Sequence, residues 1–486
     1  MRLSLSRIAE LVAADAISAG FDPQQIPIGY SIDSRTVRAG ELFFAVRGER
    51  LDGHDFVPQA LAKGAVAAVV SRESFSPVLA ACGGRTKLDG QGTSGGLASP
   101  PPPLMAVEDT LLALQILARA VRQLWGRSLI AVTGSVGKTT TKESIAHLLA
   151  TRFQVHKSEG NFNNHFGLPL MLLKLKPEHD VAVVEMGMSH LGEITALAQI
   201  ALPETGVVTN VAPVHLEFFS SVAEIARAKY ELIESLPATG TAVLNADDPY
   251  VSQFGRSFGG KVITYGVSPL SGVKAENFRA QGTEGSSFDL VVGGHRERVR
   301  LSLAGRHNVG NALAAVAVAL ESGLSLGEAI AALASLEPAD KRGQVVRIGN
   351  IQVINDCYNS NPKALAAMVD LLASMPAERR IVVAGEMLEL GPEGNAMHFE
   401  AGEYMADQGI NLVLGVRGLA EKIVEGAKER GRKAEFVSTP EDAGRWLARE
   451  TRQGDVVLLK GSRGVKLERA LEAWKQELSA VSGGKG

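Results

Sequence analysis

The chain has 486 residues, 45% of them hydrophobic and 21% charged, and its 50 Lys and Arg against 53 Asp and Glu give a formal charge of -3. This composition argues against a disordered chain and against a global electrostatic attraction to nucleic acid or anionic lipid. Two cysteines far apart in sequence argue against a disulfide framework, so we expect a cytoplasmic protein with roughly two to four domains.

The N-terminal region predicts a helix followed by a small α/β unit. Residues 1–20 interrupt their apolar positions with Arg7, Glu10 and Asp15, which indicates an amphipathic helix rather than a signal peptide. The strand-like runs ELFFAV and AVAAVV then flank the helix-like DFVPQALAKG. Residues 82–103, CGGRTKLDGQGTSGGLASPPPP, lack apolar periodicity and predict a flexible loop near a domain boundary. No apolar run reaches membrane-spanning length, so we expect no membrane span.

The rest of the chain alternates strand-like and helical segments. A helix is expected over residues 107–125, followed by the strands SLIAVT, VAVVE, GVVTN, TAVLN and KVITYG with helical segments between them. This alternation predicts a mainly parallel sheet covered by helices. After a seam at SLEPADKRG, the runs NIQVIND, RRIVVAGE, NLVLGV and GDVVLLKG predict a further α/β domain. The predicted domains are therefore residues 1–105, 106–338 and 339–486.

The stretch TGSVGKTT is a candidate phosphate-binding loop. It follows a buried-looking strand and precedes a helical run, and Lys138 and Thr139 suit phosphate and Mg²⁺ respectively. The first glycine of the strict motif is missing, because Val132 occupies its position. The alternative is an ordinary glycine-rich turn between a strand and a helix. The loop residues are Thr133, Gly134, Ser135, Val136, Gly137, Lys138, Thr139 and Thr140.

Three further residues fit a site next to such a loop. Glu185 ends a strand and His215 follows another, so both are expected to face the crevice of the loop, where they could share a Mg²⁺ ion. Taken alone, each is better explained as a capping or surface residue. Lys229 lies on an otherwise apolar helical stripe. Its ammonium either reaches out to water along a packed stem or points into the site.

Polar segments near later strands are also candidates. NADDP (245–249) and RHNVGNALAA (306–315) suit a nucleotide base or ribose, although a turn and a helix cap are the alternatives. Asp356 follows a strand, and KGSRGVKLE is expected to place Lys460, Ser462 and Arg463 at a helix N-terminus. That position would suit a carboxylate.

Together these segments resemble the Mur ligase family of ATP-dependent amide-forming enzymes, from about Ser31 to about Glu468. Members carry a TGxxGKT loop that lacks the first glycine of the strict motif. DSRTVRAGELFFAVRGERLDGHDFVPQALAKGA resembles the uridine-nucleotide-binding domain of two subgroups, which add the third residue or D-alanyl-D-alanine. GNFNNHFGLPLMLL, VVEMGMSHLGEI, NDCYNSNPKAL and LLKGSRGVKLE are similar to the subgroup that adds D-alanyl-D-alanine.

The resemblance implies an α/β fold with a small uridine-nucleotide-binding domain, a central ATPase domain and a Rossmann-like C-terminal domain. It implies ATP and Mg²⁺ as cofactors, UDP-N-acetylmuramoyl-tripeptide and D-alanyl-D-alanine as substrates, and a monomer. ATP would activate the tripeptide carboxylate as an acyl phosphate.

The resemblance also assigns roles to individual residues. The catalytic residues would be Lys138, Glu185, His215 and Lys229, and the metal ligands would be Thr139, Glu185, His215 and a carbamylated Lys229. Asn308, Asn311, Arg342 and Asp356 would contact ATP. The uridine diphosphate end of the substrate would contact Ser31, Asp33, Ser34, Arg35 and Arg47. The muramoyl peptide would lie near Asn163 and Asn164, and the incoming dipeptide near Lys460, Ser462 and Arg463.

Three alternatives remain at this stage. The nearest is a family member that adds diaminopimelate or lysine as the third residue. A folylpolyglutamate or cyanophycin-type ligase would use the same core, and a nucleotide-dependent binding module would have no ligase activity. The loop 82–103 has no recognised counterpart.

Overall fold

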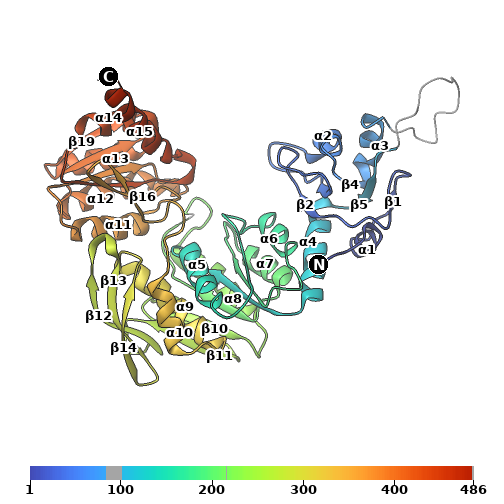
Figure 1. Ribbon diagram of the computed structural model, residues 1–486, viewed down its shortest axis with the longest axis horizontal. Coiled ribbons are helices and arrows are strands. Elements are labelled where there is room, and N and C mark those ends of the chain that lie inside the picture. Colours follow the sequence, from blue (N-terminus) through green and yellow to red (C-terminus); the bar gives the residue numbers. More distant parts are fainter. Residues whose placement is uncertain (84–100, 215, 484–486) are drawn as a thin grey trace. The chain divides into compact units, whose positions relative to one another are not determined.

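The structure, a computed structural model, describes residues 1–83, 101–214 and 216–483 (Figure 1). Most of the predicted loop 82–103, and His215, lie outside the described residues. The chain divides into two compact units, which are described separately. The first comprises Met1–Leu129, Gln154–Met186 and Thr195–Pro203, and the second comprises Ile130–Phe153, Gly187–Ile194 and Glu204–Gly486.

The first unit contains a five-stranded sheet in the order β1-β5-β4-β3-β2. Its strands are parallel except for β1, which runs antiparallel to β5. Every residue of β4 is buried, as expected for a strand covered on both faces. The elements of this unit are α1 (Leu5–Leu11), β1 (Ala16–Ile17), β2 (Gly29–Ser31), β3 (Glu41–Phe44), η1 (Gly53–Phe56), α2 (Val57–Ala62), β4 (Ala67–Ser71), α3 (Arg72–Ala81), β5 (Leu104–Val107), α4 (Thr110–Trp125), β7 (Val155–Lys157), α6 (Gly167–Leu172) and β8 (Val181–Glu185).

The N-terminal helix is shorter than the sequence predicts. The Ser4 side chain caps α1, which ends at Leu11. Ala13 then takes a φ of +51°, a left-handed conformation that a right-handed helix does not contain. The chain continues into β1 at Ala16, where an edge strand replaces the predicted helix.

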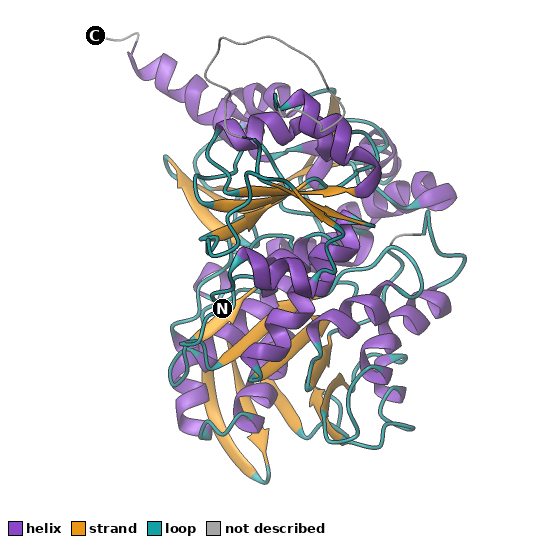
Figure 2. Ribbon diagram, turned by 90° about the vertical axis from the view of Figure 1, so that its right-hand side faces the viewer, coloured by secondary structure: helices purple, strands orange, loops and turns teal. Residues whose placement is uncertain are grey.

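The second unit carries the sheet that follows the candidate phosphate loop. Strands β6, β9, β10, β11 and β12 are parallel neighbours, and β12, β13 and β14 continue the sheet antiparallel. The β13–β14 hairpin forms a long pair of strands at the lower end of Figure 2. The elements are β6 (Ser128–Thr133), α5 (Lys138–Leu149), α7 (Glu193–Ala201), β9 (Thr205–Val208), α8 (Val222–Glu234), β10 (Thr241–Asn245), η2 (Val251–Gln253), β11 (Lys261–Gly266), β12 (Val273–Ala280), η3 (Gly282–Glu284), β13 (Ser286–Val292), β14 (His295–Leu301), α9 (Arg306–Glu321) and α10 (Leu326–Ala334), with residues of β6 and α7 divided between the units.

A six-stranded sheet in the order β15-β16-β20-β17-β18-β19 follows in the same unit, parallel except for β15. Figure 1 shows α11 and α12 on one side and α14 and α15 on the other. Neighbouring strand residues alternate between two cores, with Val382 in one and Ile381 in the other. The elements are β15 (Gln344–Ile348), β16 (Ile351–Asp356), α11 (Pro362–Ser374), β17 (Arg379–Gly385), η4 (Gly391–Glu393), α12 (Gly394–Asp407), β18 (Leu412–Val416), α13 (Ala420–Glu429), β19 (Lys433–Val437), α14 (Pro440–Glu450), β20 (Asp455–Lys460), η5 (Arg463–Val465) and α15 (Glu468–Gly483).

These sheets confirm the predicted α/β class with mainly parallel strands. The antiparallel strands β12–β14 are an addition that the sequence pattern did not predict. The division at residues 105/106 and 338/339 stays a prediction. Within the described residues, no helix is both long enough and apolar enough to span a bilayer.

Candidate functional site

The candidate phosphate loop has the strand–loop–helix geometry that its sequence predicts. It leaves β6 after Thr133, and α5 begins at Lys138. Gly134 and Gly137 have φ angles of +142° and +86°, which favour glycine. A Cβ on Gly134 would lie 1.8 Å from the Thr209 hydroxyl oxygen, and one on Gly137 would lie 2.5 Å from Asn311 Oδ1. Both glycines are therefore required by conformation and by space.

Asn210, the second residue after β9, holds the middle of this loop. Its Nδ2 donates to the Val136 carbonyl at 2.9 Å, and its Oδ1 accepts from the Val136 N–H at 3.0 Å. The Thr209 hydroxyl donates to the same carbonyl at 2.7 Å. Neither residue is a candidate from the sequence, although a Thr-Asn pair at the end of a strand in the same predicted sheet was the available signal. These bonds fix the peptide on which the loop conformation depends.

We expect Asn210→Ala to weaken ATP binding about thirtyfold, because two hydrogen bonds worth roughly 1 kcal/mol each are lost from the loop. Titration with a fluorescent ATP analogue measures the change. Asn210→Asp, which places an anionic oxygen against the Val136 carbonyl and near the phosphates, should lose more affinity than the alanine variant. An unchanged dissociation constant for Asn210→Ala would show that the loop does not need this support.

Asn311, on α9, lies against the same loop. Its Oδ1 accepts from the Thr141 hydroxyl at 3.1 Å, and its Nδ2 donates to Asn308 Oδ1 at 3.0 Å. The Asn308 amide donates in turn to the Ala304 carbonyl. The structure thus joins the two predicted nucleotide residues to each other and joins Asn311 to the start of α5, a supporting contact that sequence alone did not indicate.

The carboxylates of the segment NADDP serve local structure. Asp248 accepts from the N–H groups of Tyr250, Val251 and Val211, and Asp247 accepts from Val267. These contacts favour the turn over a nucleotide contact for both carboxylates.

Lys138 begins the helix after the loop, and Lys229 lies close enough to it for their charges to interact. The Lys138 ammonium donates to the Gly134 and Ser135 carbonyls at 2.8 and 3.4 Å. Lys229 lies on α8 with only 2% of its surface exposed, between the buried stripe residues Ile225 and Leu232. Burial lowers the pKa of Lys229 well below its ordinary value, and the positive charge of Lys138 lowers it further. Burial excludes the alternative in which the Lys229 ammonium reaches out to water.

In the first unit, Glu185 at the end of β8 is buried, and its Oε1 accepts from the Asn163 amide at 2.8 Å. Asn164 instead accepts from the Gly167 N–H at 2.9 Å, at the start of α6. The structure therefore brings Asn163 to Glu185 and gives Asn164 a local contact. The described residues contain no group of three or more His, Cys, Asp or Glu side chains suited to a metal. A Mg²⁺ ion that keeps phosphate and water ligands does not need such a group.

The N-terminal candidates lie at or after the ends of the adjacent strands β2 and β3. The Arg35 guanidinium pairs with Asp33 at 2.7 Å, and the Ser34 hydroxyl donates to Gln59. The Ser31 hydroxyl accepts from the Asp33 N–H at 3.2 Å, which shapes the turn after β2. The turn after β2 thus carries the four candidates Ser31, Asp33, Ser34 and Arg35, and Ser34 attaches it to Gln59 on α2.

Arg47 pairs with Asp52 at 3.0 Å and with Glu73 at 3.2 Å. Partial burial raises the pKa of Asp52, but hydrogen bonds from His54 and Arg47 outweigh this effect and lower it to about 2. His54 is buried and accepts from the Ser71 N–H at 2.9 Å. The Arg47 guanidinium is therefore held by a carboxylate that stays ionised at neutral pH.

Asp356 and Lys460 face each other across the paired strands β16 and β20. The Lys460 ammonium lies 2.5 Å from Asp356 Oδ2 and donates to the Asn359 carbonyl at 2.9 Å. Only 3% of the Lys460 side chain is exposed. Lys460 thus acts in the structure as the partner of Asp356.

The predicted helix N-terminus at 460–463 is wrong in its boundaries. Lys460 ends β20, Ser462 precedes the 3₁₀ turn η5, and the helix α15 begins only at Glu468. Lys466, with a φ of +57°, prevents η5 from continuing as an α-helix. The Ser462 hydroxyl donates to the Ser360 carbonyl, and Arg463 is 55% exposed. Arg463 is therefore the residue of this group that is best able to meet a ligand.

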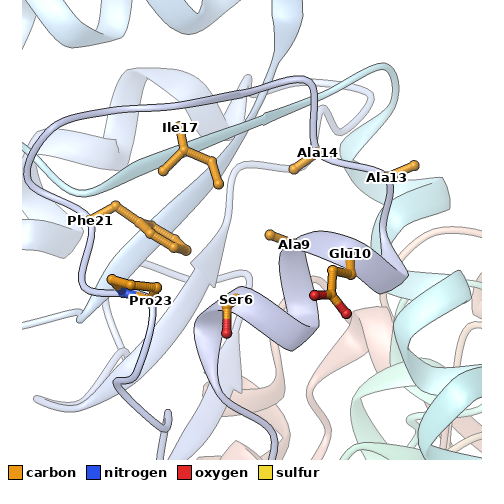
Figure 3. A pocket seen from close by; sticks show the side chains of 8 residues that line it. All are labelled: Ser6, Ala9, Glu10, Ala13, Ala14, Ile17, Phe21 and Pro23. Carbon is orange, nitrogen blue, oxygen red and sulfur yellow. The ribbon is translucent and has the colours of Figure 1, made fainter.

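A shallow hollow in the first unit has none of these candidates in its lining (Figure 3). It is formed by α1, by the segment after that helix and by Phe21. Its lining is mainly apolar and contains Ser6, Ala9, Glu10, Ala13, Ala14, Ile17, Phe21 and Pro23.

Comparisons with protein families match three regions of the chain. The Mur ligase family catalytic domain matches residues 29–84, the Mur ligase middle domain matches residues 132–319, and the Mur ligase glutamate ligase domain matches residues 341–463. The matches include the phosphate loop, Asn311 and the Asp356–Lys460 pair.

Individual relatives match over nearly their whole length. UDP-N-acetylmuramoyl-tripeptide--D-alanyl-D-alanine ligase of Bacillus subtilis is 33% identical over 476 residues, which cover 96% of this chain and 97% of that protein. The crystal structure of MurF from Acinetobacter baumannii has a TM-score of 0.85 at 27% identity and covers 98% of this chain and 99% of that one. MurF ligase from Thermotoga maritima in complex with ADP has a TM-score of 0.77 at 29% identity and covers 93% and 98% of the two chains.

Proposed function

Because the chain belongs to the Mur ligase family, we propose that it joins D-alanyl-D-alanine to the terminal carboxylate of UDP-N-acetylmuramoyl-tripeptide. ATP is converted to ADP and phosphate in the reaction, which is a step of peptidoglycan precursor synthesis. The observation that carries this proposal is the similarity to the Bacillus subtilis ligase of that name, which covers 96% of this chain.

The first chemical step activates the tripeptide carboxylate, whose own oxygen is a poor leaving group. One carboxylate oxygen attacks the γ-phosphorus of ATP, the bond to the bridging oxygen breaks, and ADP leaves. The loop N–H groups at the start of α5 and the Lys138 ammonium stabilise the charge on the transferring group. Since Lys138 donates to carbonyls of its own loop, it must turn from them toward the phosphates.

The second step forms the amide bond. The free amine of the dipeptide attacks the acyl carbon, and the bond from that carbon to the phosphate-bearing oxygen breaks. Phosphate leaves with one oxygen of the original carboxylate, and the nitrogen loses one proton to solvent. Water would hydrolyse the acyl phosphate, so the site has to exclude it. We propose that Arg342 and Asp356 reach the nucleotide when the C-terminal domain closes.

Mg²⁺ bound with ATP would supply positive charge at the phosphates and, as a hard cation, would take oxygen ligands. We propose the Thr139 hydroxyl as one ligand, because it lies in the first turn of α5. The roles of Glu185, His215 and a carbamylated Lys229 as ligands of a second metal site remain predictions from the family resemblance. Asn163 is proposed to lie near the peptide of the substrate, and the segment 31–35 and Arg47 near its uridine diphosphate.

Carbamylation of Lys229 is favoured by its surroundings. Only a neutral amine can attack CO₂, and burial of Lys229 favours the neutral form by lowering its pKa. The product is an anionic oxygen donor, which a buried position near the Lys138 ammonium stabilises better than a second cation. This accounts for a lysine on the apolar stripe of α8.

We further propose that the protein acts in the cytoplasm as a monomer. ATP and the nucleotide-linked precursor that the proposed reaction needs are cytoplasmic compounds. Light scattering of the purified protein measures its mass against the 51.3 kDa of one chain.

The acceptor is tested by phosphate release with two donor and acceptor sets. We expect release with UDP-N-acetylmuramoyl-tripeptide and D-alanyl-D-alanine, and only background release with the corresponding dipeptide donor and diaminopimelate or lysine. Release with the second set alone would assign the chain to the ligases that add the third residue. The same assay without any acceptor measures uncoupled ATP hydrolysis.

A further inference from the structure

Tyr358, in the loop after β16, lies beside two of the proposed functional arginines. The Arg342 Cζ lies 4.1 Å from the centroid of the Tyr358 ring, and the Arg463 Cζ lies 5.8 Å from it. Both distances are within the range of cation–π attraction, and the shorter one is a stacking distance. One ring therefore contacts the arginine proposed for ATP and the arginine proposed for the acceptor.

Glu468, at the start of α15, pairs with Arg463 and with Lys341, the residue before Arg342. Its Oε1 accepts from Arg463 at 2.7 Å and lies 3.4 Å from the Lys341 ammonium. The Glu468 side chain is only 16% exposed, so this carboxylate is better shielded from solvent than a surface ion pair.

A backbone hydrogen bond also links Tyr358 to the segment that carries Arg342. Lys341 immediately precedes Arg342, and its carbonyl accepts from the Tyr358 N–H at 3.3 Å. Lys341 has a φ of +56°, an unfavourable conformation for a lysine that surrounding contacts must maintain. The segment that enters β15 is thus attached to the C-terminal sheet by the Tyr358 backbone, the Tyr358 ring and Glu468.

The positive charges of Arg342 and Arg463 explain why an aromatic side chain is needed at Tyr358. Two guanidinium groups near each other repel, and the partly exposed position reduces but does not remove that repulsion. The face of an aromatic ring attracts both, and Glu468 offsets the charge of Arg463. The stacking of Arg342 on the Tyr358 ring therefore indicates a role for this side chain beyond packing.

We propose that Tyr358 is a positioning residue that holds Arg342 and Arg463 as a pair, so that Arg463 is fixed to bind the terminal carboxylate of the dipeptide acceptor. This inference rests on the proposed function, since it takes D-alanyl-D-alanine as the acceptor. Tyr358 itself contacts neither substrate. It acts by restricting the arginine side chains before the acceptor arrives, which lowers the entropy cost of binding.

The experiment compares two acceptors that differ only in the group that Arg463 would bind. D-Alanyl-D-alanine carries the carboxylate, and D-alanyl-D-alaninamide carries a neutral amide in its place. The KM for each acceptor is measured by phosphate release with the wild type, Tyr358→Leu and Tyr358→Phe. Tyr404→Leu, a ring loss on α12 of the same domain, is the control for a general effect on packing.

We expect Tyr358→Leu to raise the KM for D-alanyl-D-alanine roughly three- to thirtyfold and the KM for the amide less than about twofold. Tyr358→Phe, which keeps the ring, should stay within about twofold of the wild type for both. Tyr404→Leu should not distinguish the two acceptors.

Two results would overturn the inference alone: an equal change for both acceptors in Tyr358→Leu, or no change for either. Equal losses in Tyr358→Phe and Tyr358→Leu would show that the hydroxyl, and not the ring, matters. A wild-type protein that releases no phosphate with D-alanyl-D-alanine would contradict the proposed function and this inference together.

Discussion

Lys138→Ala is expected to abolish ligation while the fold is kept. The variant removes the only side-chain charge that the sequence TGSVGKTT offers to the phosphates, and loss of one such group costs at least roughly 10²–10³-fold in rate. The side chain is partly exposed and donates to carbonyls of its own loop, so its removal should have little effect on thermal stability. Phosphate release measures the rate, and circular dichroism measures the unfolding temperature.

Lys174→Ala is the matched control, because Lys174 forms an exposed ion pair with Glu159 that contributes little to stability. It should ligate like the wild type. Ligation at the wild-type rate by Lys138→Ala would refute the assignment of the phosphate loop.

Lys229→Ala is expected to lose at least about 100-fold in the rate of ligation, because the variant removes the proposed carbamate and with it an anionic ligand of the second metal site. A short-chain carboxylic acid should restore part of the activity, since it can supply the missing anionic oxygen. Absence of any rescue, together with a mass spectrum that shows only the free amine in the wild type, would contradict carbamylation.

A second variant at this position tests burial separately from catalysis. In CO₂-depleted buffer Lys229 stays a free amine, and its pKa in the folded protein is below its unfolded value. Between the two values the unfolded state binds more protons, so the free energy of unfolding rises with pH and falls as pH decreases. Lys229→Met, which has no titrating group, should unfold at a higher temperature than the wild type at neutral pH and should lack this pH dependence. A lower unfolding temperature for Lys229→Met would show that the buried amine is well compensated.

The sequence predicts well those features that depend on residues close together in the chain. The loop at 133–140 is recognisable because strand, glycines and helix start are consecutive, and the structure confirms this geometry. The stripe of α8 is a local helical pattern, so spacing places Lys229 on a mainly apolar face, but it does not decide between a buried amine and one that reaches water.

Contacts between distant segments were beyond the sequence. Asn210 lies 74 residues from Val136, and Asn311 lies 170 residues from Thr141. A polar side chain at a strand end gives no indication of which loop it will meet. For the same reason the Asp356–Lys460 pair, 104 residues apart, appeared as two separate candidates.

The β13–β14 hairpin has a signal in the sequence. Gly293 and Gly294 separate two runs of alternating residues and have φ angles of +56° and +84°. A Gly-Gly pair between such runs is a hairpin signal, and it connects β13 to β14. The many charged residues of HRERVRL obscured the strand pattern.

The transfer of oxygen from the peptide carboxylate to phosphate tests the central claim most directly. UDP-N-acetylmuramoyl-tripeptide labelled with ¹⁸O at both oxygens of its terminal carboxylate is ligated to D-alanyl-D-alanine, and the released phosphate is analysed by mass spectrometry. An acyl phosphate intermediate predicts one ¹⁸O atom in each phosphate. Ligation that leaves the phosphate without ¹⁸O would contradict carboxylate activation by ATP.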